Sequence, residues 1–203
     1  MSSKTAPSTS SSSFAVMVSG SIESCSLPGQ TNAYCKYQLA HGEDWQLLSG
    51  MEDGITQTAI INTSAGGEAS IRSSRNPRLV WNFPLDITYR STNPFGWPQL
   101  IVSVYGIDFL GRDVIQGYGC IHLPTTPGSH TLKVRLFRPV SSSGIQRWLS
   151  WILGSRPEFS DPRFPALSEG REVTRVQSYG DVLVKINLTT KGMDAFGYDH
   201  GAS

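Results

Sequence analysis

The 203-residue sequence has no long apolar run, few charges and little cysteine. No stretch approaches the ~18 consecutive apolar residues that a membrane-spanning helix requires. Residues 1–13, MSSKTAPSTSSSS, have neither the apolar core nor the cleavage site of a secretory signal. Seventeen basic and sixteen acidic residues give a formal net charge of +1, which excludes a nucleic-acid-binding protein held by bulk positive charge. We therefore expect a cytoplasmic protein without a nucleic-acid partner.

Recognisable enzyme motifs are also missing. The sequence contains no GxSxG, GxxxxGK[ST] or HExxH pattern. Gly117-Tyr118-Gly119 begins like a dinucleotide fingerprint, but it lacks the third glycine and lies in a predicted strand. His122 and His130 flank a turn beside Cys120, yet no fourth metal ligand is evident, and a polar pair that fixes the turn is the simpler interpretation. Three cysteines without a CxxC pair are expected to be reduced thiols. We predict no enzyme activity, no metal and no cofactor.

What the chain does have is glycine and proline, at 20 and 12 residues, with alternating apolar and polar residues between them. Alternation places every second side chain on one face of a strand. The clearest case is residues 79–90, in which Pro84 predicts a bulge or an edge position. Further strands are predicted at residues 14–23, 34–40, 45–48, 56–61, 99–105, 114–122, 131–137 and 182–188. Many short strands separated by turns are typical of an antiparallel β-sandwich.

A single helix is predicted, over residues 143–154. Ser143 and Gln146 have the spacing of a capping box, and Gly154 suits the C-terminal end. Apolar residues follow Ser143 at helical spacing, while Trp151 and Leu153 lie off that stripe. The predicted organisation is a Ser-rich disordered tail at 1–13, one domain at 14–190 and a C-terminal tail at 191–203.

Four ordered pieces of sequence give the most specific signal. The first is a G-x-D-x-x-G-R turn between two predicted strands, and the second is a G-Y-G in the strand that follows. An L-P-x-x-P-G-x-H piece and an R-P before the predicted helix come next. The residues are Gly106, Asp108, Gly111, Arg112, Gly117, Tyr118, Gly119, Leu123, Pro124, Pro127, Gly128, His130, Arg138 and Pro139. In this order and spacing they resemble the B9-domain family of ciliary proteins, over residues 10–195.

The resemblance implies a fold, a function and partners. The fold is an all-β, C2-like antiparallel β-sandwich of about eight strands with one inserted helix. The function is that of a non-enzymatic scaffold subunit of the tectonic-like (MKS) complex at the ciliary transition zone, which supports ciliogenesis, the ciliary diffusion barrier and hedgehog signalling. The partners are other B9-domain proteins, tectonic-type membrane proteins and further transition-zone proteins. The location is the cytoplasm and cytoskeleton at the ciliary basal body and transition zone.

The residues of the turn motif are expected to have a mainly structural role. Gly106 and Gly111 permit a tight turn, and an aspartate such as Asp108 can accept a hydrogen bond from the backbone two residues on. Arg112 can clamp a neighbouring carbonyl or carboxylate. Calcium-binding C2 domains use about five aspartates, because Ca²⁺ needs many oxygen ligands. Asp108 and Asp113 supply too few, so we expect no calcium site.

Two groups of residues are candidates for contact with a partner or a membrane. One is the aromatic and aliphatic end of the predicted helix, and the other is a basic loop before the long strand. The residues are Trp148, Trp151, Ile152, Leu153, Arg72, Arg75 and Arg78. Each basic residue near an anionic surface contributes only ~1 kcal/mol, so the loop predicts weak contact with membranes. Calcium-independent binding to phospholipid by a peripheral C2-like module is therefore the alternative function.

Overall fold

The computed structural model describes residues 13–61, 77–108, 110–139 and 176–197. The described residues form ten strands and one short 3₁₀ helix. The strands are β1 (Phe14–Ser26), β2 (Asn32–Ala40), β3 (Trp45–Ser49), β4 (Asp53–Ile55), β5 (Ala59–Ile60), β6 (Leu79–Ser91), β7 (Gln99–Ile107), β8 (Asp113–His122), β9 (Gly128–Pro139) and β10 (Val176–Lys191), and the 3₁₀ helix is Asp194–Phe196. No helix in this part of the chain has the length and hydrophobicity needed to cross a bilayer.

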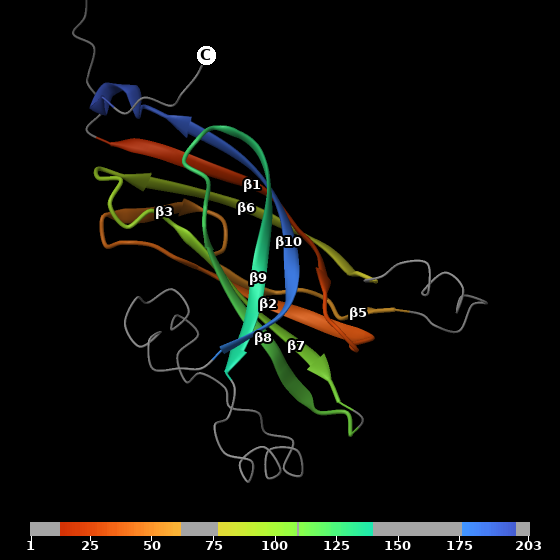
Figure 1. Ribbon diagram of the computed structural model, residues 1–203. Helices are drawn as coiled ribbons and strands as arrows, with labels where there is room; N and C mark the ends of the chain where they lie inside the picture. Colours follow the sequence, from red (N-terminus) through yellow and green to blue (C-terminus); the bar gives the residue numbers. More distant parts are fainter. Residues whose placement is uncertain (1–12, 62–76, 109, 140–175, 198–203) are drawn as a thin grey trace, which may run out of the picture.

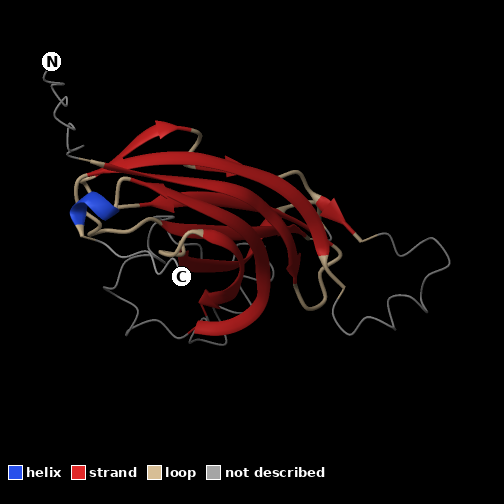
Figure 2. Ribbon diagram, turned by 90° about the horizontal axis from the view of Figure 1, so that it is seen from above, coloured by secondary structure: helices blue, strands red, loops and turns tan. Residues whose placement is uncertain are grey.

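The strands form one antiparallel sheet that curls on itself. Its order is β3-β6-β1-β10-β9-β8-β7-β2-β4, and β5 pairs with β2. Long ladders join β1 to β6 and β10, and β7 to β2 and β8, whereas a single pair, Tyr118 with Phe137, joins β8 to β9. The strongly curved strands are seen in Figures 1 and 2. The sheet therefore consists of two halves with one narrow backbone connection.

The hydrophobic core lies between these two halves. Alternate side chains of β1, β6, β9 and β10 are buried together with alternate side chains of β2 and β7. The rings of Tyr37 in β2 and Phe83 in β6 lie 5.7 Å apart. The indole Nε1 of Trp81 in β6 donates a hydrogen bond to the carbonyl oxygen of Ala33 in β2, at 3.0 Å. The halves thus pack as the two layers of a sandwich, and the all-β antiparallel prediction is confirmed.

Strand β6 shows how the sequence pattern becomes structure. Leu79, Trp81, Leu85, Ile87 and Tyr89 are buried on the core face, as the alternation predicts. The register between β6 and β1 shifts near the middle of the ladder, and Asn82 has a positive φ of 47°. This irregularity lies two residues before Pro84, which agrees with the predicted bulge.

Some predicted boundaries differ from the structure. Of the strand expected at 56–61, only Ala59–Ile60 (β5) forms, and the short strand β4 (Asp53–Ile55) ends just before Thr56. The reason is local: the backbone N–H of Thr56 donates to the carbonyl oxygen of Cys35, and its Oγ1 accepts from the N–H of Cys35. This pairing interrupts the regular ladder. The described residues therefore hold ten strands, two of them very short, where about eight were expected.

Ordered structure continues past residue 190, where the domain was expected to end. β10 continues to Lys191, Met193 is buried in the core, and the ring of Phe196 lies 5.8 Å from that of Phe14. Burial of these two apolar side chains stabilises an ordered segment. The polar residues around them do not predict this order from the sequence. The predicted tail at residues 1–12 and the predicted helix at 143–154 lie outside the described residues.

Candidate functional site

The turn between β7 and β8 is built around the carboxylate of Asp108. Its Oδ1 accepts hydrogen bonds from the backbone N–H groups of Leu110, at 2.8 Å, and Arg112, at 2.9 Å. Its Oδ2 accepts from the Nε of Arg112 at 2.9 Å and lies 2.8 Å from Nη2 of the same guanidinium. Gly111 has a φ of 76°, a left-handed conformation that glycine adopts without strain. The turn chemistry expected from the sequence is present, because Asp108 bonds the backbone two residues on and Arg112 clamps a carboxylate.

These contacts fix the charge state of Asp108. The hydrogen bond from the backbone of Arg112, together with those from its guanidinium and from Leu110, lowers the pKa of the Asp108 carboxyl below its ordinary value. Both carboxylate oxygens are occupied by donors of the turn itself. Among the described residues, no three His, Cys, Asp or Glu side chains gather in a way that could hold a metal ion.

The lowered pKa makes an acid-stability prediction. The unfolded chain takes up a proton before the folded chain as pH falls, so the stability from Asp108 is present above about pH 4 and is lost below it. The variant Asp108→Asn keeps an oxygen acceptor but loses the charge. We expect it to be less stable than the wild type at pH 7 and to lose less stability between about pH 5 and 2. Urea unfolding at a series of pH values measures this.

Leu110→Ala is the control for that measurement, because Leu110 is 59% exposed and carries no charge. It is expected to keep the acid dependence of the wild type. Parallel stability curves for the wild type and Asp108→Asn would contradict the assigned role of Asp108.

The G-Y-G piece lies in β8 where β9 passes close to it. Tyr118 is buried in a second, smaller hydrophobic cluster with Tyr105 and Ile115, and its ring centroid lies 6.4 Å from that of Phe137. Its two glycine neighbours face the core. A Cβ at position 117 would lie 3.1 Å from Cβ of Leu136, and one at position 119 would lie 2.6 Å from Cγ1 of Val134. Both distances are shorter than ordinary van der Waals contact, so the glycines allow the two halves of the sheet to approach here.

The remaining motif residues surround the turn between β8 and β9. Pro124 is half-buried in this turn, and Gly128 has a φ of 125° at the start of β9. The Nε2 atom of His130 lies 2.8 Å from the carbonyl oxygen of Thr126. At the end of β7, a Cβ at Gly106 would lie 3.0 Å from side-chain atoms of both Gln30 and Gln116. All of these contacts are with the chain's own residues.

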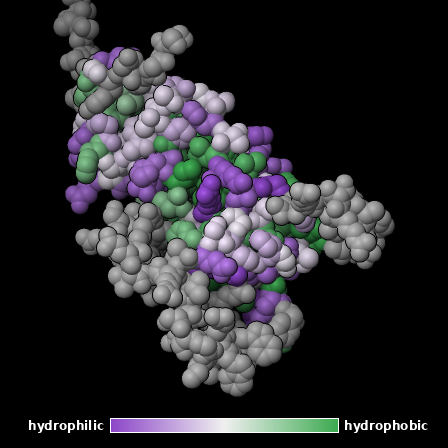
Figure 3. Space-filling view, in the orientation of Figure 1, coloured by the Kyte–Doolittle hydropathy of each residue, from purple (hydrophilic) through white to green (hydrophobic). Residues whose placement is uncertain are grey.

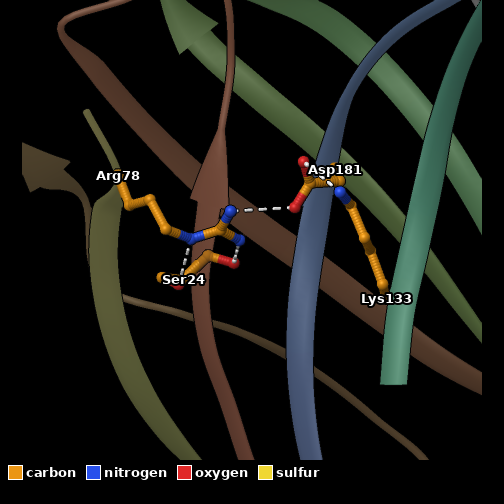
Figure 4. A network of polar contacts seen from close by, with 4 residues as sticks. All are labelled: Ser24, Arg78, Lys133 and Asp181. Atoms are coloured by element: carbon orange, nitrogen blue, oxygen red, sulfur yellow. Dashed lines mark hydrogen bonds and ion pairs between the residues drawn. The ribbon is translucent and has the colours of Figure 1, made fainter. Parts of the chain in front are cut away.

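Arg78 is the one member of the predicted basic loop that the structure describes. Its Nε donates to Oγ of Ser24 at 2.8 Å and its Nη2 to the carbonyl oxygen of Ser24 at 3.2 Å. Its Nη1 donates to Oδ2 of Asp181 at 2.9 Å, and the Nζ of Lys133 lies 3.6 Å from Oδ1 of that aspartate (Figure 4). Arg78 thus ties β6 to β1 and β10.

Ser24 and Asp181 were not singled out by sequence reasoning. Asp181 is 103 residues from Arg78, and no local pattern links the two. Their position is set by irregular pairing, since the β1 register shifts beside Ser24 and the β9–β10 register shifts beside Asp181. The other predicted contact residues, Arg72, Arg75, Trp148, Trp151, Ile152 and Leu153, lie outside the described residues.

Burial disfavours the reactive thiolate form of two of the cysteines. Burial raises the pKa of the Cys25 thiol to about 12, and it raises the pKa of the Cys35 thiol as well.

The surface carries both hydrophobic and hydrophilic residues, and in Figure 3 the hydrophobic ones gather near the middle of the face shown. Several large apolar side chains are exposed. They include Met51, Ile55, Ile60, Val80, Phe95 and Leu110.

Comparison with known proteins gives consistent matches. The family model described as "Ciliary basal body-associated, B9 protein" (B9-C2) matches residues 16–189. The chain is 50% identical to B9 domain-containing protein 1 of Xenopus laevis over 190 residues, covering 94% of this chain and 91% of the relative. It is 28% identical to B9 domain-containing protein 2 of Homo sapiens, covering 91% and 98%. A solved structure, a C2 domain of plant extended synaptotagmin 1, aligns with a TM-score of 0.39 at 13% identity, covering 87% of this chain and 93% of that one.

Proposed function

The chain belongs to the B9 family of ciliary basal body-associated proteins, and we propose that it is a non-enzymatic scaffold subunit of the tectonic-like (MKS) complex at the ciliary transition zone. In this role it supports ciliogenesis, the ciliary diffusion barrier and hedgehog signalling. Its proposed partners are other B9-domain proteins, tectonic-type membrane proteins and further transition-zone proteins. It acts in the cytoplasm, on the cytoskeleton at the base of the cilium.

The observation that carries the proposal is the extent of the family match. The match to residues 16–189 begins in β1 and ends in β10, so the B9 domain and the described fold coincide. The most specific motif in that domain is used internally, because Asp108 and Arg112 bind each other.

Co-expression with a B9 domain-containing protein 2 from the same organism tests the proposal. The two proteins are expected to elute together as one complex from a size-exclusion column at micromolar concentration. A fluorescently tagged chain is expected to concentrate at the base of the cilium in ciliated cells. Separate elution together with a diffuse cellular signal would contradict the scaffold function.

The alternative of calcium-independent phospholipid binding makes a different prediction. Arg78 is engaged by Ser24 and Asp181, so it has fewer donors left for lipid headgroups. Vesicles of phosphatidylcholine with phosphatidylserine are therefore expected to leave most of the protein in the supernatant after centrifugation. Strong sedimentation with these vesicles, combined with no B9 complex, would favour the alternative function.

A further inference from the structure

Strand β4 forms one end of the sheet and leaves part of its backbone unpaired by any described strand. On its inner side it pairs with β2: the N–H of Leu39 donates to Glu52 at 2.7 Å, and the N–H of Thr56 donates to Cys35 at 2.9 Å. Alternate residues of a strand direct their N–H and C=O groups to opposite sides. Asp53 and Ile55 therefore direct theirs away from β2.

This edge has two of the usual protective features, since it is only three residues long and carries the charge of Asp53, but it lacks the others. Proteins also commonly guard an exposed edge with lysine, proline or a bulge. Residues 51–61, MEDGITQTAII, contain no lysine, arginine or proline. The edge strand at the opposite end of the sheet order, β3, differs, because its register with β6 shifts between Leu47 and Ser49. Of the two ends of the sheet, the β4 end has the more regular register over its length.

The side chains of β4 determine which residues a partner strand needs in order to pair with it. Ile55 is 57% exposed and lies on the outer face opposite Lys36. Asp53 is exposed on the same face, and it makes no ion pair with the described part of the chain. Gly54, between them, faces inward, and a Cβ there would lie 2.7 Å from the ring of Tyr37. An added strand would meet an apolar side chain and a carboxylate, two residues apart.

We propose that β4 is a strand-addition site, at which an extended segment of a partner protein pairs antiparallel with Asp53–Ile55. This inference rests on the proposed scaffold function and names its contact surface. In the antiparallel register, the partner residue opposite Ile55 precedes by two the residue opposite Asp53. The segment therefore carries an aliphatic residue, then any small residue, then lysine or arginine. Cross-strand pairs of these kinds stabilise a sheet, and the charge of Asp53 selects the register.

Amide hydrogen exchange on the wild-type complex with B9 domain-containing protein 2 tests the pairing without any substitution. The amides of Asp53 and Ile55 are expected to exchange at least tenfold more slowly in the complex than in the free chain. Unchanged exchange at both amides in a formed complex would overturn the strand-addition site while leaving the scaffold function intact. A wild-type chain that forms no complex would overturn both.

Ile55→Pro tests the same site by removing its outward N–H. The ladder to β2 uses the N–H of Thr56, so the fold is retained. The affinity for B9 domain-containing protein 2 is expected to fall at least tenfold, and Asp53→Lys is expected to cause a loss of similar size through charge reversal. Leu48→Lys, on the exposed edge strand β3, is the matched control and is expected to bind like the wild type. Wild-type affinity in both β4 variants would refute the proposal.

Discussion

Replacing Gly119 with alanine is expected to lower the free energy of unfolding by about 2–3 kcal/mol. The new Cβ would lie 2.6 Å from Cγ1 of Val134 and 3.1 Å from the carbonyl oxygen of Arg135, so the Val134 side chain or the backbone of β9 must shift. Alanine in place of a strand glycine normally gains ~0.5–1 kcal/mol from reduced freedom of the unfolded chain. The steric cost exceeds that gain. Urea unfolding monitored by tryptophan fluorescence measures the difference.

A double-mutant cycle identifies the cause of the loss. Val134→Ala removes the methyl group that the new Cβ would meet, so the variant with both changes is expected to lose less than the sum of the two single losses, by about 1 kcal/mol or more. Strict additivity would show that the close approach of β8 and β9 is not the source of the cost. Gly29→Ala is a useful reference, because a Cβ at that turn position has no atom within 4 Å and its cost comes from the backbone alone.

The second large effect is expected at Arg78. Arg78→Met leaves the carboxylate of Asp181, whose side chain is only 15% exposed, without its guanidinium partner. Breaking a buried pair costs about 3–5 kcal/mol, and the 32% exposure of the Arg78 side chain reduces the expected loss to about 2–3 kcal/mol. Thermal and urea unfolding at neutral pH both measure this loss of stability.

Two variants separate charge pairing from general surface effects. Lys133→Met removes the other cation near Asp181, but Lys133 is 65% exposed and 3.6 Å away, so a loss below about 1 kcal/mol is expected. In the Arg78→Met background, Asp181→Leu is expected to recover part of the stability, because it removes the unpaired carboxylate. A loss for Lys133→Met as large as that for Arg78→Met would contradict the tie between β6, β1 and β10.

The strands of this protein are predictable where side chains alternate over many residues. β6 is the clearest example, because Leu79, Trp81 and Tyr89 all face the core as the pattern requires. Prediction fails where a hydrogen bond or ring contact between distant residues overrides the pattern. Thr56 bonds Cys35 and is not part of a strand although one was expected to begin there, and Phe196 is ordered because it packs on Phe14. Neither contact leaves a periodic signal.

The same distinction applies to the candidate site. The Asp108–Arg112 contact spans four residues, so the turn chemistry of its residue types was sufficient to predict it. The need for glycine at position 119 could not be predicted from the sequence, because the atoms that exclude a side chain there belong to Val134 and Arg135 in another strand. The contacts of Arg78 with Ser24 and Asp181 could not be predicted for the same reason, because Asp181 is 103 residues away in the sequence.

The pairing of β1 with β10 has a consequence for how the molecule is made. Ala15 pairs with Lys191 and Cys25 with Val182, so β1 leaves the ribosome long before the strand that pairs with it. During synthesis, β1 has β6 on one side only, and its other flank stays open until β10 emerges. Contacts between residues so far apart in sequence slow folding and expose unpaired strands in the meantime. Completion of this half of the sheet therefore waits for the synthesis of β10, and nascent chains that stop before β10 are expected to depend on chaperones.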